Sequence, residues 1–329
     1  MTQTIQVKIE EGSENRVRHT YNRNYAPNDS ETAGGVIRPF TRVTFPTFED
    51  YITDIKKTLL KMTERSVRKH NVRSDIELRV ASVKDASSMN SAASYLAEES
   101  VSGKKAVFKV YEQNLARTLY PLVFHSRRPT SGQTGKEKVQ TTVDHEMRHH
   151  LDHDFIVGHY SILDEFSNLD DYTVRYLLKC RTEGFATYCG DLFVENEDRE
   201  DLDERLKVHK SLFERFKRLA VEEYDIFEWT NPYVFMIDQV FNTEFIEGIN
   251  FSPYKQGDDL MRVIACANVG IRPLSPEEYH SFLGEVGNHS LLSFYQEYFR
   301  ASRELGLEPM FPEQETLELV ESKLAHHND

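Results

Sequence analysis

The sequence is poor in cysteine and has no long apolar run. Its three cysteines, Cys180, Cys189 and Cys266, form no CxxC pair and cannot all be joined in disulfides, which fits a reducing compartment. No segment approaches the roughly 18 uninterrupted apolar residues of a membrane-spanning helix. The first residues, MTQTIQVKIE, lack the basic and then apolar pattern of a secretion signal. We therefore expect a cytoplasmic protein without a membrane partner.

Positive charge is scarce in the second part of the chain. Residues 1–140 carry 23 basic and 16 acidic side chains, net +7, whereas residues 141–329 carry 17 basic and 38 acidic ones, net −21. Binding of nucleic acid depends on neutralising phosphates with Lys and Arg, so we expect no nucleic acid partner. Hydrophobic residues still make up 39% of the 329 residues, enough for a folded globular protein.

The first part of the chain shows an arm, a helix and strands. Residues 11–35 hold few branched aliphatic side chains and many turn formers, which predicts a mobile arm. Apolar residues then recur at helical spacing over 48–69. Two segments of high β-branched content, Ile76–Ser82 and Lys104–Tyr111, predict strands, and Leu119–Ser126 predicts a weaker third.

The second part of the chain predicts helices only. The expected helices span Glu200–Leu219, begin at Asn231 and at Ser275, and span Leu291–Leu305 and Pro312–His326. Capping residues support several of them, because Ser275 precedes a proline and lies three residues before a glutamate. The fold class is therefore α+β in front and all-α behind, with a boundary near residue 195.

One motif carries chemistry. Residues 145–149 read HEMRH, an HExxH pattern. On a helix, residues four apart point the same way, so His145 and His149 can offer two imidazole nitrogens to one metal ion, while Glu146 flanks the open position. Thr141 or Thr142 could cap this helix. Catalytic sites of this kind need a third ligand from elsewhere in the chain.

A second stretch offers a candidate for the third ligand. Residues 183–188 read EGFATY and follow the apolar helical run Tyr172–Cys180. HExxH followed by EGFATY resembles the gluzincin class of zinc metallopeptidases, in particular its aminopeptidase-N-like and minigluzincin-like members. The resemblance implies one Zn²⁺ bound by His145, His149 and Glu183, with Glu146 as the catalytic general base.

Sequence patterns and this resemblance, which covers roughly residues 105–195, together predict three parts of the chain. Composition predicts a mobile arm and lead-in at 1–46, the resemblance implies a zincin-like metallopeptidase domain at 47–195 with a small sheet and the active-site helix, and helical spacing predicts an all-α region at 196–329. Such an enzyme hydrolyses peptide or protein substrates. The 33 residues between His149 and Glu183 exceed the usual gap, and the absence of a GAMEN-like segment gives no support for aminopeptidase specificity.

Other ligand sets stay open at this point. His153 or His159 could replace Glu183, as in SprT-like metallopeptidases, or the chain could be a non-catalytic metal-binding or interaction protein. Metzincins are excluded because Phe155 stands where they need a histidine. For His150 and His153 themselves we expect exposed or outer-sphere roles.

The resemblance leaves several supporting roles unassigned. Tyr188, Tyr160 and His159 are candidates for sharing the negative charge of the transition state, and Asp191 for orienting a ligand. A substrate peptide would lie along an exposed edge strand, for which Lys104–Tyr111 is the candidate.

Overall fold

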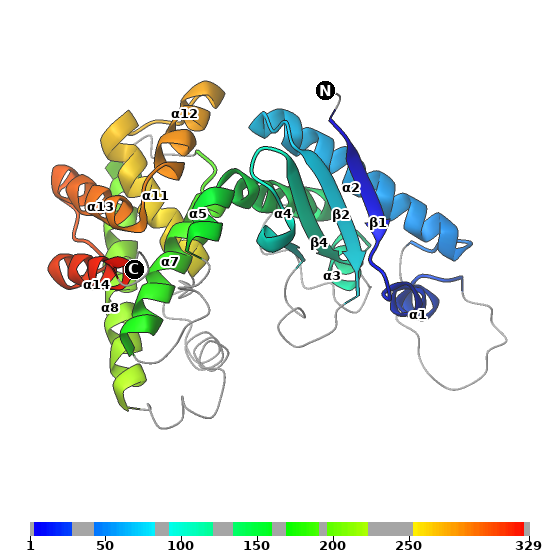
Figure 1. Cartoon of the computed structure of the whole chain (residues 1–329), viewed down its shortest axis with the longest axis horizontal. Coiled ribbons are helices and arrows are strands. Elements are labelled where there is room, and N and C mark those ends of the chain that lie inside the picture. Colours follow the sequence, from blue (N-terminus) through cyan, green and yellow to red (C-terminus); the bar gives the residue numbers. More distant parts are fainter. Residues whose placement is uncertain are drawn as a thin grey trace. The chain divides into compact units, whose positions relative to one another are not determined.

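The computed structural model divides into two compact units, Met1–His153 and Asp154–Asp329 (Figure 1). The structure describes residues 3–27, 43–82, 92–120, 134–159, 169–190, 196–222 and 253–325. The division after His153 falls inside the range 47–195, which we expect to form the metallopeptidase domain. That these residues form one functional domain stays a prediction.

The first unit contains one small sheet with helices. Its strands are β1 (Ile5–Ile9), β2 (Asp75–Ala81), β3 (Ala93–Tyr95) and β4 (Lys105–Tyr111), and its helices are α1 (Glu14–Asn24), α2 (Phe48–His70), α3 (Glu112–Leu119), α4 (Gly135–Leu151) and the short 3₁₀ helix η1 (Ala97–Glu99). The predicted helix over 48–69 and the two predicted strands are confirmed as α2, β2 and β4. The prediction of a weaker strand at Leu119–Ser126 is wrong at its start, since Leu119 ends α3. Residues 121–126 lie outside the described residues.

The order of the strands corrects one expectation. The sheet has the order β1-β2-β4-β3, with β1, β2 and β4 parallel and β3 antiparallel to β4. The prediction that Lys104–Tyr111 is an edge strand is wrong, because β4 lies between β2 and β3. Its sequence reflects that position, because the strand from Ala106 to Phe108 is buried on both faces.

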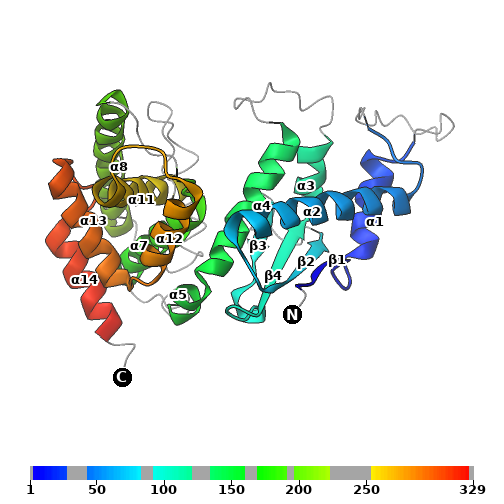
Figure 2. The same ribbon diagram turned by 90° about the horizontal axis from the view of Figure 1, so that it is seen from above.

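The two faces of the sheet differ in chemistry. Ile76, Leu78 and Val80 of β2 are buried on the face that α2 and α4 cover (Figures 1 and 2). Strand residues alternate between faces, so Glu77 and Arg79 lie on the other face. There the Glu77 carboxylate forms ion pairs with Lys8 at 2.7 Å, Arg79 at 2.6 Å and Lys105 at 3.1 Å. The apolar face therefore fixes α4 on the sheet.

The predicted mobile arm at 11–35 is wrong over its first part. Residues 14–24 form α1, in which Val17 and Tyr21 are buried. The Tyr21 ring packs against Phe48 at a centroid distance of 5.8 Å. Aromatic rings anchor this segment although it has few branched aliphatic residues, and that is why composition alone missed it. Residues 28–42 lie outside the described residues.

The second unit is helical. It contains α7 (Leu169–Thr187), α8 (Asn196–Glu222), α11 (Pro253–Val269), α12 (Pro276–Gly287), α13 (Leu291–Leu305) and α14 (Glu313–Ala325), and α5 (His153–Gly158) begins at the division. The predicted start at Ser275 is confirmed by a capping box with Glu278. The helix predicted to begin at Asn231 lies outside the described residues.

The α+β fold class is confirmed, since every described strand precedes α3 and helices follow. None of the described helices combines the length and the apolarity needed to cross a membrane.

Candidate metal centre

The HExxH motif lies in α4, which begins earlier than the sequence suggested. Thr134 caps the helix: its hydroxyl accepts a hydrogen bond from the Glu137 backbone, and the Glu137 carboxylate accepts one from the Thr134 backbone. The expected cap at Thr141 or Thr142 is wrong, because these hydroxyls donate to backbone carbonyls one turn back, which is a mid-helix arrangement. The motif therefore lies in the C-terminal part of a capped helix, with His149 in the last turn.

Both histidines lie on one side of α4. Met147 is fully buried in the core of the first unit, on a different stripe of the helix. The Nε2 atoms of His145 and His149 are 3.0 Å apart, and the rings meet edge to face. Two nitrogens bound to one zinc ion at the tetrahedral angle are about 3.3 Å apart, so the pair needs little rearrangement to share an ion.

Glu183 lies in α7, the helix that the apolar run Tyr172–Cys180 predicted. Its side chain is buried, and the Lys179 ammonium one turn earlier lies 3.8 Å from its carboxylate. The neighbouring Arg181 is fully buried, with its guanidinium 4.0 Å from the centre of the Phe155 ring. Lys179 was not singled out from the sequence, although its i,i+4 spacing from Glu183 is the signal that could have found it.

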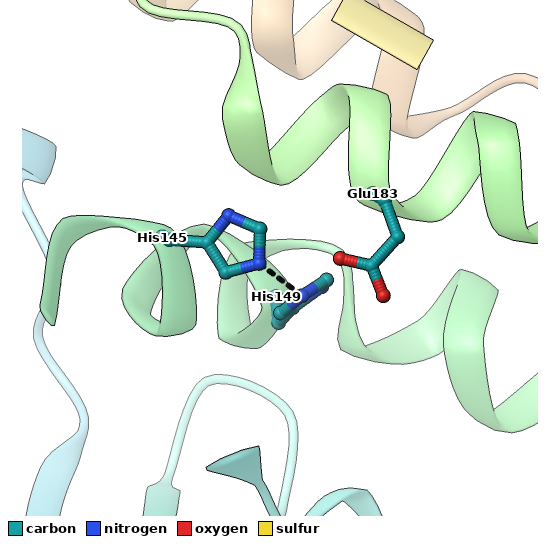
Figure 3. A group of neighbouring side chains, drawn as sticks. All are labelled: His145, His149 and Glu183. Atoms are coloured by element: carbon teal, nitrogen blue, oxygen red, sulfur yellow. Dashed lines mark hydrogen bonds between the residues drawn. The ribbon is translucent and has the colours of Figure 1, made fainter. Parts of the chain in front are cut away.

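His145, His149 and Glu183 form a group that could hold a metal ion (Figure 3). One ligand atom from each, two imidazole nitrogens and a carboxylate oxygen, lie within 4.8 Å of one another. In Figure 3 the Glu183 carboxylate points toward the His149 ring. The group is the one of its kind among the described residues, and it contains neither His153 nor His159.

A buried polar cluster supports the helix beside the motif. The carboxylate of Asp144 accepts hydrogen bonds from Ser66, from Lys69 at 2.9 Å and from Gln140 at 3.2 Å. Burial raises the pKa of Asp144, but the hydrogen bonds from His70, Ser66 and Lys69 outweigh burial and hold this pKa well below its usual range. Asp144 therefore ties α4 to α2 as a carboxylate. Glu146, two residues later, is also buried.

The other candidates lie elsewhere. The His153 ring binds Tyr95, and the His159 ring binds the Phe155 carbonyl at 2.9 Å. Of the two roles expected for His150 and His153, the exposed one is wrong, because both are buried, whereas the outer-sphere role stays a prediction. Tyr188 is packed in the core of the second unit, 5.6 Å from the Phe282 ring centre. Tyr160 and Asp191 lie outside the described residues.

No protein-family model, no curated protein and no solved structure matches this chain. The chemistry of the candidate centre therefore follows from its residues alone.

Proposed function

We propose that this protein is a cytoplasmic zinc-dependent peptidase that acts on peptide or protein substrates. The proposal rests on the convergence of His145 and His149 with Glu183, which is 34 residues after His149, on one group of ligand atoms. In the proposed site Glu146 is the general base. The zincin-like character of residues 47–195 belongs to the same proposal.

The donor set fits zinc. Zn²⁺ in catalytic sites takes three protein ligands from imidazole nitrogen, thiolate and carboxylate, and keeps one position open. Two imidazoles and one carboxylate make such a set, and the Cys180 thiol, one turn before Glu183 in α7, is fully buried with a pKa that burial raises. A bound zinc ion would supply Lewis acidity toward a water molecule and the scissile carbonyl.

The chain's own residues would move the protons. Successive residues of a helix point about 100° apart, so Glu146 flanks the side of α4 that His145 and His149 share. A carboxylate there can take a proton from the attacking water and return it to the leaving amine. Because Glu146 is buried, water in the site cannot readily screen its charge.

Two other functions are weaker. A SprT-like site would need His153 or His159 as third ligand, and neither belongs to the described ligand group. A purely structural metal site or an interaction protein has no use for Glu146 beside an open position. The cluster with Glu183 therefore favours the peptidase.

The direct test is Glu146→Gln, with the exposed residue Glu98 changed to Gln as a matched control. Elemental analysis should find about one zinc per chain in the wild type and in both variants. Cleavage of a quenched peptide library should be lost in Glu146→Gln only. Undiminished cleavage by Glu146→Gln contradicts the proposed role of Glu146. A second variant, Glu183→Ala, tests the third ligand, because unchanged zinc affinity in this variant favours a histidine ligand instead.

A further inference from the structure

A buried polar network lies next to the ligand residues and has no role in the chemistry above. The Tyr95 hydroxyl lies 2.6 Å from His153 Nδ1 and 3.2 Å from His150 Nδ1, and His150 Nε2 lies 2.8 Å from the Ser74 hydroxyl. Ser74, His150 and His153 are 3%, 4% and 8% exposed. All four residues belong to the first compact unit.

The donors and acceptors of this network can be paired in one continuous series of hydrogen bonds. If Ser74 donates to His150 Nε2, then His150 Nδ1 donates to Tyr95, and the Tyr95 hydroxyl donates to His153 Nδ1. The reverse order is equally complete. In both directions of donation each hydrogen bond contains one proton. The Tyr95 hydroxyl is therefore needed to connect the two histidines.

The network joins four elements at the end of α4, since His153 is the first residue of α5. Ser74 immediately precedes β2, and Tyr95 ends β3. His150 is in the last turn of α4, and His153 follows the C-cap residue Asp152. The ends of helices fray readily, so a side-chain network here holds a turn that would otherwise be mobile.

The turn held by the network carries a ligand. His149 and His150 are consecutive, so their side chains point about 100° apart around the helix axis. Fixing His150 against Ser74 and Tyr95 sets the rotation of the last turn, and thereby the direction of the His149 imidazole. A ligand constellation must be held within about 0.5 Å to bind its ion well.

We propose that Tyr95 is a positioning residue for the metal centre, acting through His150 and His153 on the orientation of His149. The inference rests on the proposed metal site and goes beyond it, because it gives the sheet a role in setting metal affinity. Tyr95 itself binds neither metal nor substrate.

The test measures metal affinity instead of turnover. Full-length Tyr95→Phe is compared with the wild type and with Tyr111→Phe, whose hydroxyl makes no hydrogen bond within the described residues. Zinc affinity is measured by competition with a chromophoric chelator, and the site geometry by the visible spectrum of the Co²⁺-loaded protein. We expect Tyr95→Phe to weaken zinc binding about tenfold and to alter the Co²⁺ spectrum, with Tyr111→Phe unchanged.

A double-mutant cycle separates positioning from general stability. If Tyr95 acts through His153, the effects of Tyr95→Phe and His153→Ala overlap. The double variant should then weaken zinc binding by a smaller factor than the product of the factors of the two single variants. Wild-type affinity and spectrum in Tyr95→Phe overturn the inference, as does a lower unfolding temperature with unchanged affinity. Wild-type protein that binds zinc without cleaving peptides overturns the proposed function alone, whereas wild-type protein that binds no metal overturns both.

Discussion

Gly184 and Gly257 hold the backbones of α7 and α11 in direct contact. A β carbon added at Gly184 would lie 2.6 Å from the α carbon of Gly257 and would overlap its carbonyl. Side chains at either position would force the two helices apart. Since Glu183 directly precedes Gly184, this close contact fixes the part of α7 that carries the proposed third ligand.

We expect Gly184→Ala to destabilise the protein and to weaken zinc binding. The atoms in the way are backbone atoms and cannot turn aside, so overpacking costs roughly 3 kcal/mol, more than the ~1 kcal/mol that alanine gains in a helix. Gly284→Ala in α12 is the matched control, because an added β carbon there meets nothing within 4 Å. Urea unfolding and chelator competition measure both effects. Equal stability of the two variants would show that the helices can separate without cost.

Stability should depend on pH through Glu112. This residue begins α3, is fully buried and accepts a hydrogen bond from Tyr51. Burial raises the pKa of Glu112 from 4.5 to about 7, against the opposing hydrogen bonds of Tyr51 and Thr20 and the charge of Arg117. The folded protein therefore holds a proton that the unfolded chain releases above pH 4.5.

Glu112 stabilises the folded protein at low pH. The contribution of Glu112 is complete below about pH 4.5, declines as the pH rises to about 7 and is constant above it, a loss on the order of 3 kcal/mol. Glu112→Gln imitates the protonated form, so its free energy of unfolding should lack this decline. Urea unfolding at pH 4.5, 6 and 8 measures the difference, with Glu98→Gln expected to follow the wild type. Parallel curves for the wild type and Glu112→Gln would show that Glu112 does not titrate in this range.

Features that depend on local periodicity, such as helix faces and strands, could be predicted from the sequence. The four-residue spacing of His145 and His149 places both on one side of a helix wherever that helix begins, so their pairing survives the wrong cap at Thr141 or Thr142. Strands β2 and β4 were found from their β-branched residues. Glu183 came from the resemblance of EGFATY, because no local rule links residues that far apart in the chain.

Features that depend on tertiary contacts were missed. β3 has three residues and is held by pairing with β4, so it has no periodicity to detect. The Tyr95 network joins residues more than 50 positions apart, and the sequence leaves its histidines open between exposed and outer-sphere roles because helical spacing cannot show what packs on a helix. The close contact of Gly184 with Gly257 likewise appears only in three dimensions.

Asp144→Asn should destabilise the first unit by about 2 kcal/mol. The substitution removes a buried carboxylate that binds Ser66, Lys69 and Gln140, and leaves these donors facing an amide. The loss is smaller than for a wholly buried pair because the Lys69 side chain is 52% exposed and can return to water. Lys69→Ala should therefore cost less than about 1 kcal/mol. Urea unfolding at pH 7 tests the order of the two variants, and a larger loss in Lys69→Ala contradicts it.

Zinc should stabilise the folded protein through His149. An ion that binds only the folded chain adds about 2.7 kcal/mol at a hundred times its dissociation constant. Protein stripped with a chelator and then given zinc should show this gain in thermal or urea unfolding, and peptide cleavage should return with it. His149→Ala should lose the gain, whereas His19→Ala, at an exposed position of α1, should keep it. An equal gain in both variants would mean that zinc binds away from α4, since removal of one of three ligands from the same ion cannot leave its affinity unchanged.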